Sequence, residues 1–274
     1  MAKAFSVASW NVEHFRGKPE RAVKVINFLK KQKPDVFALY EVEGKHLNTP
    51  LFNNMPGYSF LITEGRQVQE ILIGVKRRYT VYFRQKLEFK SGIHGLRPGA
   101  YLALQTKGKD YSLLLLHTKS GSNPRGLGLR DVMHQQACKF RKVLDKRSGG
   151  QGKANYIFMG DLNLMGMKYG FKKDIDAPTG LAKLDKMAGK SKMKRLSKDV
   201  LFTWWNGSMS KYPKSDLDQV FASEHLKFRL FGRGSNKSEV TVRGWPKEGT
   251  VTRQDAWIAQ YSDHGLLFFQ VESV

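Results

Sequence analysis

The sequence predicts an α/β fold, and three observations support this class. Short apolar runs bounded by Gly, Pro or charged residues recur along the 274 residues, as buried strands do. Two longer segments carry apolar side chains at helical spacing and lie between such runs. No repeat of fixed period and no Pro/Ser-rich linker divides the chain. We therefore expect one domain over residues 1–274, with a basic insertion around residues 165–200.

The expected strands follow from the apolar runs in chain order. They cover residues 5–10, 36–40, 71–75, 101–104, 112–116, 156–159, 219–222 and 266–271. The first expected helix covers residues 20–31, where Val23, Ile26 and Leu29 recur at three-residue spacing. The second covers residues 129–144 and contains Cys138, which we expect to be a small buried hydrophobe. Helices alternate with strands early in the chain, and strand pairs are more frequent later.

The charge of the chain indicates a polyanionic partner. Lys and Arg number 47 against 24 Asp and Glu, which leaves a formal charge of +23. Nucleic acid is the first candidate, and we expect DNA rather than RNA. An anionic membrane would fit the same charge, but neither end of the sequence shows a polybasic amphipathic anchor or a lipidation motif. The basic residues 183–198 are as typical of a solvated helix or loop as of a nucleic-acid contact.

Three further features concern the cell compartment and assembly. The single cysteine excludes an intramolecular disulfide, and a reducing compartment fits this. The first residues lack the apolar core of a signal peptide, and no apolar run approaches the ~20 residues that a membrane span needs. We expect a cytoplasmic monomer.

Four short motifs place polar residues where apolar strands end. They are Trp10-Asn11-Val12-Glu13, Ala38-Leu39-Tyr40-Glu41-Val42, Met159-Gly160-Asp161-Leu162-Asn163 and Tyr261-Ser262-Asp263-His264. Loops at strand ends build the sites of α/β folds. For any one motif alone, a turn or cap residue is the simpler interpretation. Their joint occurrence changes this, because acids, amides and a histidine recur at four strand ends.

In this order, the motifs resemble the endonuclease/exonuclease/phosphatase superfamily, which includes deoxyribonuclease I and the exonuclease-III-type abasic endonucleases. The most specific parts are Gly-Asp-Leu-Asn at 160–163 and Ser-Asp-His at 262–264, and the resemblance extends over nearly the whole chain. Many relatives have Leu-Gln-Glu where this chain has Tyr40 before Glu41, but the acid remains. The resemblance implies a four-layer α/β sandwich, in which two packed β-sheets are flanked by helices.

The resemblance also implies a divalent metal held by carboxylates, because a phosphodiester and its transition state carry negative charge. Glu41 and Asp263 are the first expected ligands. Glu13 stands where the abasic endonucleases have a third acid. We expect Mg²⁺ or Mn²⁺, with Ca²⁺ as a further candidate.

Proton transfer and phosphate contacts are assigned to the remaining motif residues. His264 oriented by Asp218 is the expected proton-transfer pair, and Asp161 is the alternative acceptor of the proton from the attacking water. Asn11 and Asn163 would donate amide hydrogen bonds to phosphate oxygens.

A second pair follows from the same resemblance. His117 ends the run at residues 113–116, and Glu70 matches the acid that orients this histidine in deoxyribonuclease I. His117 would donate to the phosphate or protonate the leaving group, whereas a buried histidine satisfied by a carboxylate is the simpler alternative. The other histidines lack such a context and are expected on the surface or in packing: His14, His46, His94, His134 and His225.

Substrate contacts rest on cations and aromatic residues near the motifs. Arg97 precedes a strand, as the phosphate-binding Arg does in several relatives. Of the adjacent indoles at 204 and 205, we expect one in the core and Trp205 to be available for stacking on a base or sugar. The cations that follow His117 complete the predicted substrate contacts: Lys119, Arg125 and Arg130.

The predicted function is metal-dependent hydrolysis of nucleic acid, as a weakly specific DNA endonuclease. An abasic-site endonuclease is an alternative, but Leu-Met-Gly-Met-Lys-Tyr-Gly after residue 163 lacks the acid-containing continuation of those enzymes. A phosphomonoesterase or lipid phosphodiesterase is a second alternative, yet residues 215–219 lack the Trp-Cys-Asp-Arg signature of inositol phosphatases. A catalytically inactive nucleic-acid-binding protein is the non-enzymatic alternative, which the complete set of acids disfavours.

Overall fold

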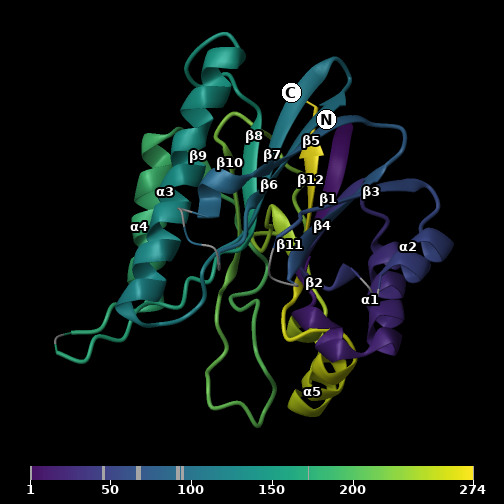
Figure 1. The fold of residues 1–274 in the computed structure, drawn as a ribbon, viewed down its shortest axis with the longest axis vertical. Helices are drawn as coiled ribbons and strands as arrows, with labels where there is room; N and C mark the ends of the chain where they lie inside the picture. Colours follow the sequence, from purple (N-terminus) through teal and green to yellow (C-terminus); the bar gives the residue numbers. More distant parts are fainter. Residues whose placement is uncertain are drawn as a thin grey trace. The chain divides into compact units, whose positions relative to one another are not determined.

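The computed structural model describes residues 2–44, 47–65, 69–90, 93, 96–171 and 173–273. The chain forms two compact units, shown in Figure 1. Unit 1 contains Met1–Thr80, Ser197–Ser215 and Lys227–Val274. Unit 2 contains Val81–Leu196 and Asp216–Leu226. Each unit has one six-stranded sheet and its own helices.

The sheet of unit 1 has the order β11-β12-β1-β2-β4-β3. β1 pairs in parallel with β2, while its pairing with β12 is antiparallel, so the sheet is mixed. The parallel pair ends at one edge of the sheet, and this brings Asn11 and the segment around Glu41 together. The strands are β1 (Lys3–Asn11), β2 (Val36–Val42), β3 (Tyr58–Ile62), β4 (Glu70–Lys76), β11 (Val240–Arg243) and β12 (Leu266–Glu272).

The helices of unit 1 supply the apolar side chains that cover its sheet. Val25, Ile26 and Leu29 of one helix and Trp257 and Ile258 of another join the sheet residues in one buried cluster. The helical segments are η1 (Glu13–Gly17), α1 (Pro19–Gln32), α2 (Asn48–Asn54), η4 (Trp245–Lys247) and α5 (Val251–Gln260).

The sheet of unit 2 has the order β5-β6-β7-β8-β10-β9. β7 pairs in parallel with β8, and β10 pairs with β8 in the antiparallel direction. β8 therefore lies between strands that place His117 and Asp218 beside Asp161. The strands are β5 (Thr80–Lys86), β6 (Gly99–Thr106), β7 (Lys109–His117), β8 (Tyr156–Asp161), β9 (Met193–Arg195) and β10 (Asp218–Ser223).

Two helices, α3 (Pro124–Arg147) and α4 (Ala177–Lys190), lie side by side in unit 2 (Figure 1). Both add side chains to the buried cluster on their sheet, together with the short helix η3 (Leu87–Lys90). Each long helix begins with a side-chain cap and has Pro in its first turn: Asn123 Oδ1 accepts from Gly126 N at 2.7 Å, and Asp176 Oδ1 accepts from Thr179 N at 2.7 Å. These caps satisfy backbone N–H groups that have no partner within the helix.

The structure confirms the predicted α/β class, and all eight predicted strand segments lie in strands. The two predicted helices correspond to α1 and to a longer α3. Cys138 is buried at 4% exposure, and burial raises the pKa of its thiol to about 12. The basic residues 183–198 include the second half of α4, all of β9 and the connecting residues that follow each of them. No helix in the described part of the chain is long and apolar enough to cross a membrane.

Candidate active site

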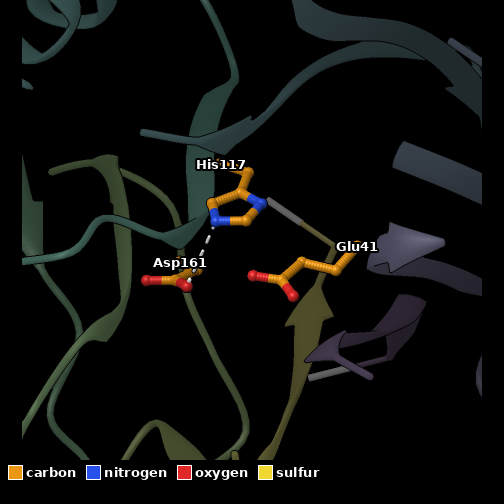
Figure 2. Close-up of side chains that lie close together, drawn as sticks. All are labelled: Glu41, His117 and Asp161. Atoms are coloured by element: carbon orange, nitrogen blue, oxygen red, sulfur yellow. Dashed lines mark ion pairs between the residues drawn. The ribbon is translucent and has the colours of Figure 1, made fainter. Parts of the chain in front are cut away.

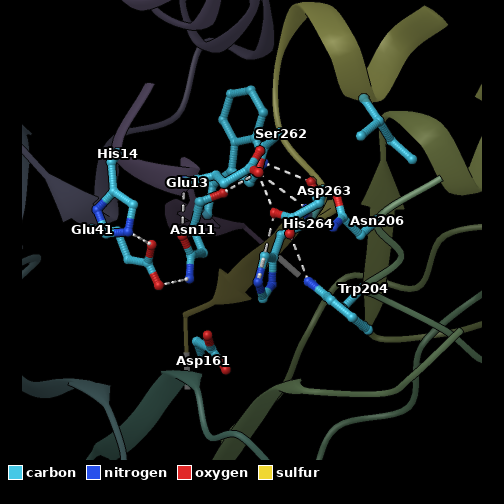
Figure 3. Close-up of polar contacts among 12 residues, drawn as sticks. Asn11, Glu13, His14, Glu41, Asp161, Trp204, Asn206, Ser262, Asp263 and His264 are labelled. Carbon is cyan, nitrogen blue, oxygen red and sulfur yellow. Dashed lines mark hydrogen bonds and ion pairs between the residues drawn. The ribbon is translucent and has the colours of Figure 1, made fainter. Parts of the chain in front are cut away.

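Asn11 and Glu41 lie together at the ends of the parallel strands of unit 1. Asn11 is the last residue of β1 and donates from Nδ2 to Glu41 Oε1 at 3.1 Å. Glu41 has a φ of 59° and lies where the register of β2 against β4 shifts between Leu39 and Val42. Such a bulge turns a side chain away from the regular alternation of a strand. It therefore directs the Glu41 carboxylate towards the amide of Asn11 (Figure 3).

A left-handed turn follows β1 and carries Glu13. Residues 13–17 all have positive φ, and the first four are not glycine. This conformation is costly for such residues and clusters at functional sites in proteins. Glu13 secures the turn, because its carboxylate accepts from Arg16 Nε and from Arg21 Nη2, each at 2.8 Å. Arg21 is 3% exposed, so Glu13 is held by a buried guanidinium.

His14 belongs to the same turn and contacts a predicted metal ligand. Its Nε2 lies 2.7 Å from Glu41 Oε2 and 2.7 Å from Gln69 Nε2 (Figure 3). His14 was expected to be an ordinary surface or packing residue, and its contact with Glu41 was not anticipated. Its neighbour Glu13 already marked the segment, but the left-handed turn that aims His14 at Glu41 has no sequence pattern.

Asp263 precedes β12, and one oxygen of its carboxylate accepts a hydrogen bond. Trp204 Nε1 donates to its Oδ2 at 2.7 Å, and Ser262 Oγ lies 3.5 Å from its Oδ1. The backbone carbonyl of Asp263 accepts from Trp205 N and from Trp245 Nε1, each at 2.9 Å. These contacts fix the carboxylate although it lies in a connection between secondary structure elements.

His264 is buried directly after Asp263. Its backbone N–H donates to Ser262 Oγ at 3.1 Å, and its carbonyl accepts from Trp10 Nε1 at 2.9 Å. Ser262 Oγ in turn donates to the carbonyl of Asn11 at 2.7 Å. The Ser-Asp-His motif is thereby tied to the end of β1, so the first and last motifs of the chain share one region of unit 1 (Figure 3).

The acids of unit 1 have the chemistry of a divalent-cation site. Burial raises the pKa of Asp263 to about 6, His264 and the Trp204 hydrogen bond lower it, and the negative charges of Glu13 and Glu41 raise it. A carboxylate whose pKa is raised by neighbouring negative charges is stabilised in its ionised form by a hard cation on oxygen ligands. Glu41 and Asp263 therefore stay the predicted ligands of a divalent metal, whereas both oxygens of Glu13 already accept from guanidinium groups.

The motif residues of unit 2 gather around Asp161. In the register of the sheet, Asp161 lies opposite His117 on one side and Asp218 on the other. His117 Nε2 is 3.5 Å from Asp161 Oδ2, and both side chains are 3% exposed (Figure 2). A buried histidine beside a buried carboxylate is suited to carrying a proton.

Asn163 is held in a fixed orientation two residues after β8. It has a φ of 49°, its backbone N–H donates to Asp161 Oδ1 at 3.0 Å, and its Nδ2 donates to the carbonyl of Thr118 at 3.0 Å. The Gly-Asp-Leu-Asn motif is thus a tight turn that fastens its amide to the residue after His117.

Two predicted pairs join residues of different units and stay predictions. Glu70 begins β4 in unit 1 and accepts from Thr63 Oγ1 at 2.5 Å, whereas its predicted partner His117 belongs to unit 2. His264 belongs to unit 1 and Asp218 to unit 2.

Two residues that were predicted to bind substrate are buried and make their contacts within the protein. Trp205 is 9% exposed and packs against Trp245 in the core, whereas Trp204 is the half-buried indole. Successive side chains of an extended segment point to opposite sides, and here Trp204 is the one that points away from the core. Arg130 is 2% exposed and donates to the carbonyls of Lys119, Gly121 and Gly166 at 2.9–3.0 Å. Neither surrounding favours substrate contact.

The remaining predicted substrate residues are more accessible. Arg97 and Lys119 are half-buried, and Arg125 is exposed in the first turn of α3. Among the histidines with no assigned role, His134 is buried, and burial lowers its pKa to about 4, as expected for a packing residue. Burial also lowers the pKa of His225. His46 and His94 lie outside the described residues.

Comparison with solved structures shows the fold. Truncated Caenorhabditis elegans TDP2 matches with a TM-score of 0.68 and 18% identity over 98% of each chain. D. rerio TDP2, in complex with single strand DNA product, matches with a TM-score of 0.65 and 16% identity over 98% of this chain and 99% of that one. The human Nocturnin catalytic domain with bound sulfate matches with a TM-score of 0.63 and 14% identity over 98% of this chain and 93% of that one. These matches confirm the predicted deoxyribonuclease I-like α/β sandwich class.

The sequence comparisons identify the family. A search of curated proteins gave no significant match. The model of the Endonuclease/Exonuclease/phosphatase family matches residues 8–264, a span that contains all four strand-end motifs. The chain therefore belongs to the Endonuclease/Exonuclease/phosphatase family.

Proposed function

We propose that the protein is a divalent-metal phosphodiesterase that hydrolyses nucleic acid, with DNA as the preferred substrate. The observation that carries the proposal is that the first and last motifs of the chain meet in unit 1: Asn11 donates to Glu41 at 3.1 Å, and Ser262, next to Asp263, donates to the carbonyl of Asn11 at 2.7 Å. Family membership supports phosphoester hydrolysis. The charge of +23 and the DNA product bound to D. rerio TDP2 support a nucleic-acid substrate.

Glu41 and Asp263 are the proposed metal ligands, and Glu13 is a third, direct or through water. A bound divalent cation would polarise the phosphate and offset the charge that develops on its oxygens. Trp204 and Asn11 orient the two primary ligands by the hydrogen bonds at 2.7 and 3.1 Å. A carboxylate that is already oriented loses less freedom when a cation binds.

The proposed reaction is attack of water on phosphorus. The new bond joins the water oxygen to phosphorus, the bond to the leaving ester oxygen breaks, and that oxygen takes up a proton. His264 or Asp161 accepts the proton of the attacking water, and His117 delivers the proton to the leaving oxygen. The amides of Asn11 and Asn163 donate to the non-bridging phosphate oxygens.

One digestion experiment tests the proposal. Purified protein with Mg²⁺ or Mn²⁺ is expected to cleave supercoiled plasmid, linear duplex, single-stranded DNA, abasic duplex or RNA, with DNA cleaved faster than RNA. Chelation by EDTA is expected to stop cleavage. If all five substrates stay intact while the protein still binds them, the chain is a binding protein and not an enzyme.

His264→Ala tests one of the two candidate proton acceptors. Loss of a general base lowers the rate by about 10²- to 10⁴-fold, and we expect His264→Ala to abolish detectable cleavage while DNA binding persists. His225→Ala is the matched control, because His225 is half-buried and lies outside all four motifs. Wild-type rates in His264→Ala would remove His264 from the mechanism.

A further inference from the structure

Many Lys and Arg side chains lie on α3, on α4 and in the residues up to 195, and the proposed reaction gives most of them no role. Residues 124–147 and 177–195 contain thirteen Lys and Arg but only three Asp and Glu. Two of the acids are engaged: Asp131 pairs with Lys183 at 2.9 Å, and Asp185 pairs with Arg195 at 2.9 Å. The third, Asp145, is buried and accepts from the backbone of the loop before β8.

Two contacts set the arrangement of the helices. Lys183 of α4 pairs with Asp131 of α3, and Arg141 of α3 donates to the carbonyl of Lys192, just beyond α4. The contacts are ten residues apart along α3 and nine residues apart along α4 and its C-terminal turn. The two helices therefore run side by side in the same direction, and Lys190 lies near the level of Lys139 on α3.

Helical spacing places the exposed lysines on one surface. Each residue advances a helix by about 100°, so Lys139, Lys142 and Lys146 fall within an arc of about 60° on the solvent side of α3. Lys142 is within about 20° of Asp131, the residue that faces α4. On α4, Lys186 and Lys190 fall within about 60° of Lys183, which faces α3. These exposed side chains form a basic helical face of Lys139, Lys142, Lys146, Lys186 and Lys190.

Within the described residues, no acid forms an ion pair with any lysine of this face. An uncompensated row of flexible cations attracts a polyanion and releases its counterions. The face offers no stacking platform, because α4 has no aromatic residue and Phe140, the aromatic residue of α3, is half-buried under Lys86. Single-stranded nucleic acid is usually held by exposed aromatic residues between the cations.

The face lies towards the end of unit 2 that is opposite the candidate catalytic residues. Asp145, near the end of α3, binds the loop before β8, and Asp161 is the last residue of β8. The six residues of β8 span about 16 Å between these two ends. The C-terminal half of α3 is therefore separated from Asp161 by the length of a strand.

We propose that the basic helical face binds the phosphate backbone of a double-helical nucleic acid, independently of its sequence and away from the catalytic residues. A long substrate would then be held at a second place, whereas a short one would not. The proposal goes beyond hydrolysis and does not require it, because binding is measured without a metal.

The test measures, by fluorescence anisotropy in EDTA, the affinity of the protein for a DNA duplex and for an RNA duplex, each of about 40 bp. The measurement is repeated at NaCl concentrations from about 50 to 200 mM, because phosphate contacts make the affinity depend on salt. The variant replaces Lys139, Lys142, Lys146, Lys186 and Lys190 by Gln. The control variant replaces an equal number of exposed lysines of unit 1 by Gln: Lys18, Lys24, Lys30, Lys31 and Lys33. Both variants lose the same net charge, so a difference between them reports the location of binding.

We expect the face variant to bind at least about tenfold more weakly and to lower the salt slope by about three or more, since each phosphate contact contributes about one. The control variant should change the affinity by no more than about threefold. Equal losses in both variants would overturn the proposal in favour of net charge alone. Equal losses for a single-stranded 40-mer would overturn the double-helical assignment. Binding of phosphatidylserine vesicles that depends on these lysines, without an effect on duplex, would assign the face to a membrane.

Discussion

Trp204 is the residue that most directly controls a proposed metal ligand. Its indole N–H donates to Asp263 Oδ2 at 2.7 Å and lowers the pKa of that carboxyl, which burial has raised to about 6. A hydrogen bond to a charged group contributes about 1.5–3 kcal/mol, which corresponds to about one pKa unit or more.

Trp204→Phe should therefore move the acid limb of the pH profile of kcat/KM to higher pH by about one unit. Tyr212→Phe is the control, because the ring of Tyr212 lies near Trp204 at a centroid distance of 6.5 Å and its side chain is 68% exposed. An unshifted acid limb in Trp204→Phe would show that Asp263 does not limit activity at low pH.

Asp35 illustrates a charge that stabilises the fold and has no proposed catalytic role. Its side chain is fully buried, and Lys3, Lys76 and Arg78 lie 2.6–2.9 Å from its oxygens. Burial alone raises the pKa of Asp35, but hydrogen bonds and charge from Lys3 and Lys76 outweigh burial and lower it to about 2. In the unfolded chain an aspartate has a pKa of about 3.9.

A lowered folded pKa stabilises the fold above the unfolded pKa, and this stabilisation is lost as the pH falls towards 2. Asp35→Asn should lower the free energy of unfolding at pH 7 by about 2 kcal/mol. The difference between wild type and variant should shrink between about pH 4 and pH 2. Urea unfolding at a series of pH values measures it, and a difference that stays constant with pH would contradict the assignment.

At the scale of elements, Arg130 links α3 to two loops. It donates to the carbonyls of Lys119 and Gly121, which follow His117, and to that of Gly166, which follows Asn163. One loop directly follows His117, and the other contains Asn163, so both adjoin predicted catalytic side chains. The buried guanidinium of Arg130 therefore holds the backbones of both loops in place.

Arg130→Met should lower the free energy of unfolding by about 3 kcal/mol, because buried carbonyls lose their donor. It should also lower kcat, since the loops after His117 and Asn163 loosen. Arg125→Met removes an exposed Arg of the same helix and should change the stability by less than about 0.5 kcal/mol. Thermal unfolding of both variants makes the comparison, and equal stability of the two would show that the carbonyls find other partners.

Some elements were predictable from the sequence because their signals are local. Asn11 and Asp161 end continuous apolar runs, and His264 stands just before one; only a buried strand or helix explains such runs. The left-handed turn at residues 13–17 was not predictable, because most of its residues are not glycine and no composition marks it. The choice between Trp204 and Trp205 depends on the phase of an extended segment. A pair of adjacent indoles does not specify that phase.

The whole molecule carries a charge of +23, which repels itself in the compact state. The Debye length falls from about 30 Å at 0.01 M salt to about 8 Å at 0.15 M, so added salt screens this repulsion. We therefore expect Tm to rise as the NaCl concentration is raised from about 10 to about 200 mM, the range over which the Debye length falls most. Calorimetry measures this, and a Tm that falls with salt would show that local ion pairs outweigh the net charge.

The division of the molecule into two units was not visible in the sequence, because it arises from pairings between distant segments. β1 pairs with β12, and the register joins Lys3 to Glu272. Apolar runs show that a strand exists but not which strand it joins. The predicted single domain therefore stays a prediction, while the two sheets are a result of the structure.

The pairing of β1 with β12 also constrains the order of folding during synthesis. All the residues of unit 2 lie between segments of unit 1 in the sequence. The sheet of unit 2 has all its strands once residue 223 has been made, whereas β1 must wait for β12, about 260 residues after it. Contacts this distant in sequence form slowly, and an unpaired strand edge is prone to aggregation. β1 can pair with β2 early, but its other edge stays open until β12 has been made, so this edge is the place where a nascent chain is most prone to pair with another chain.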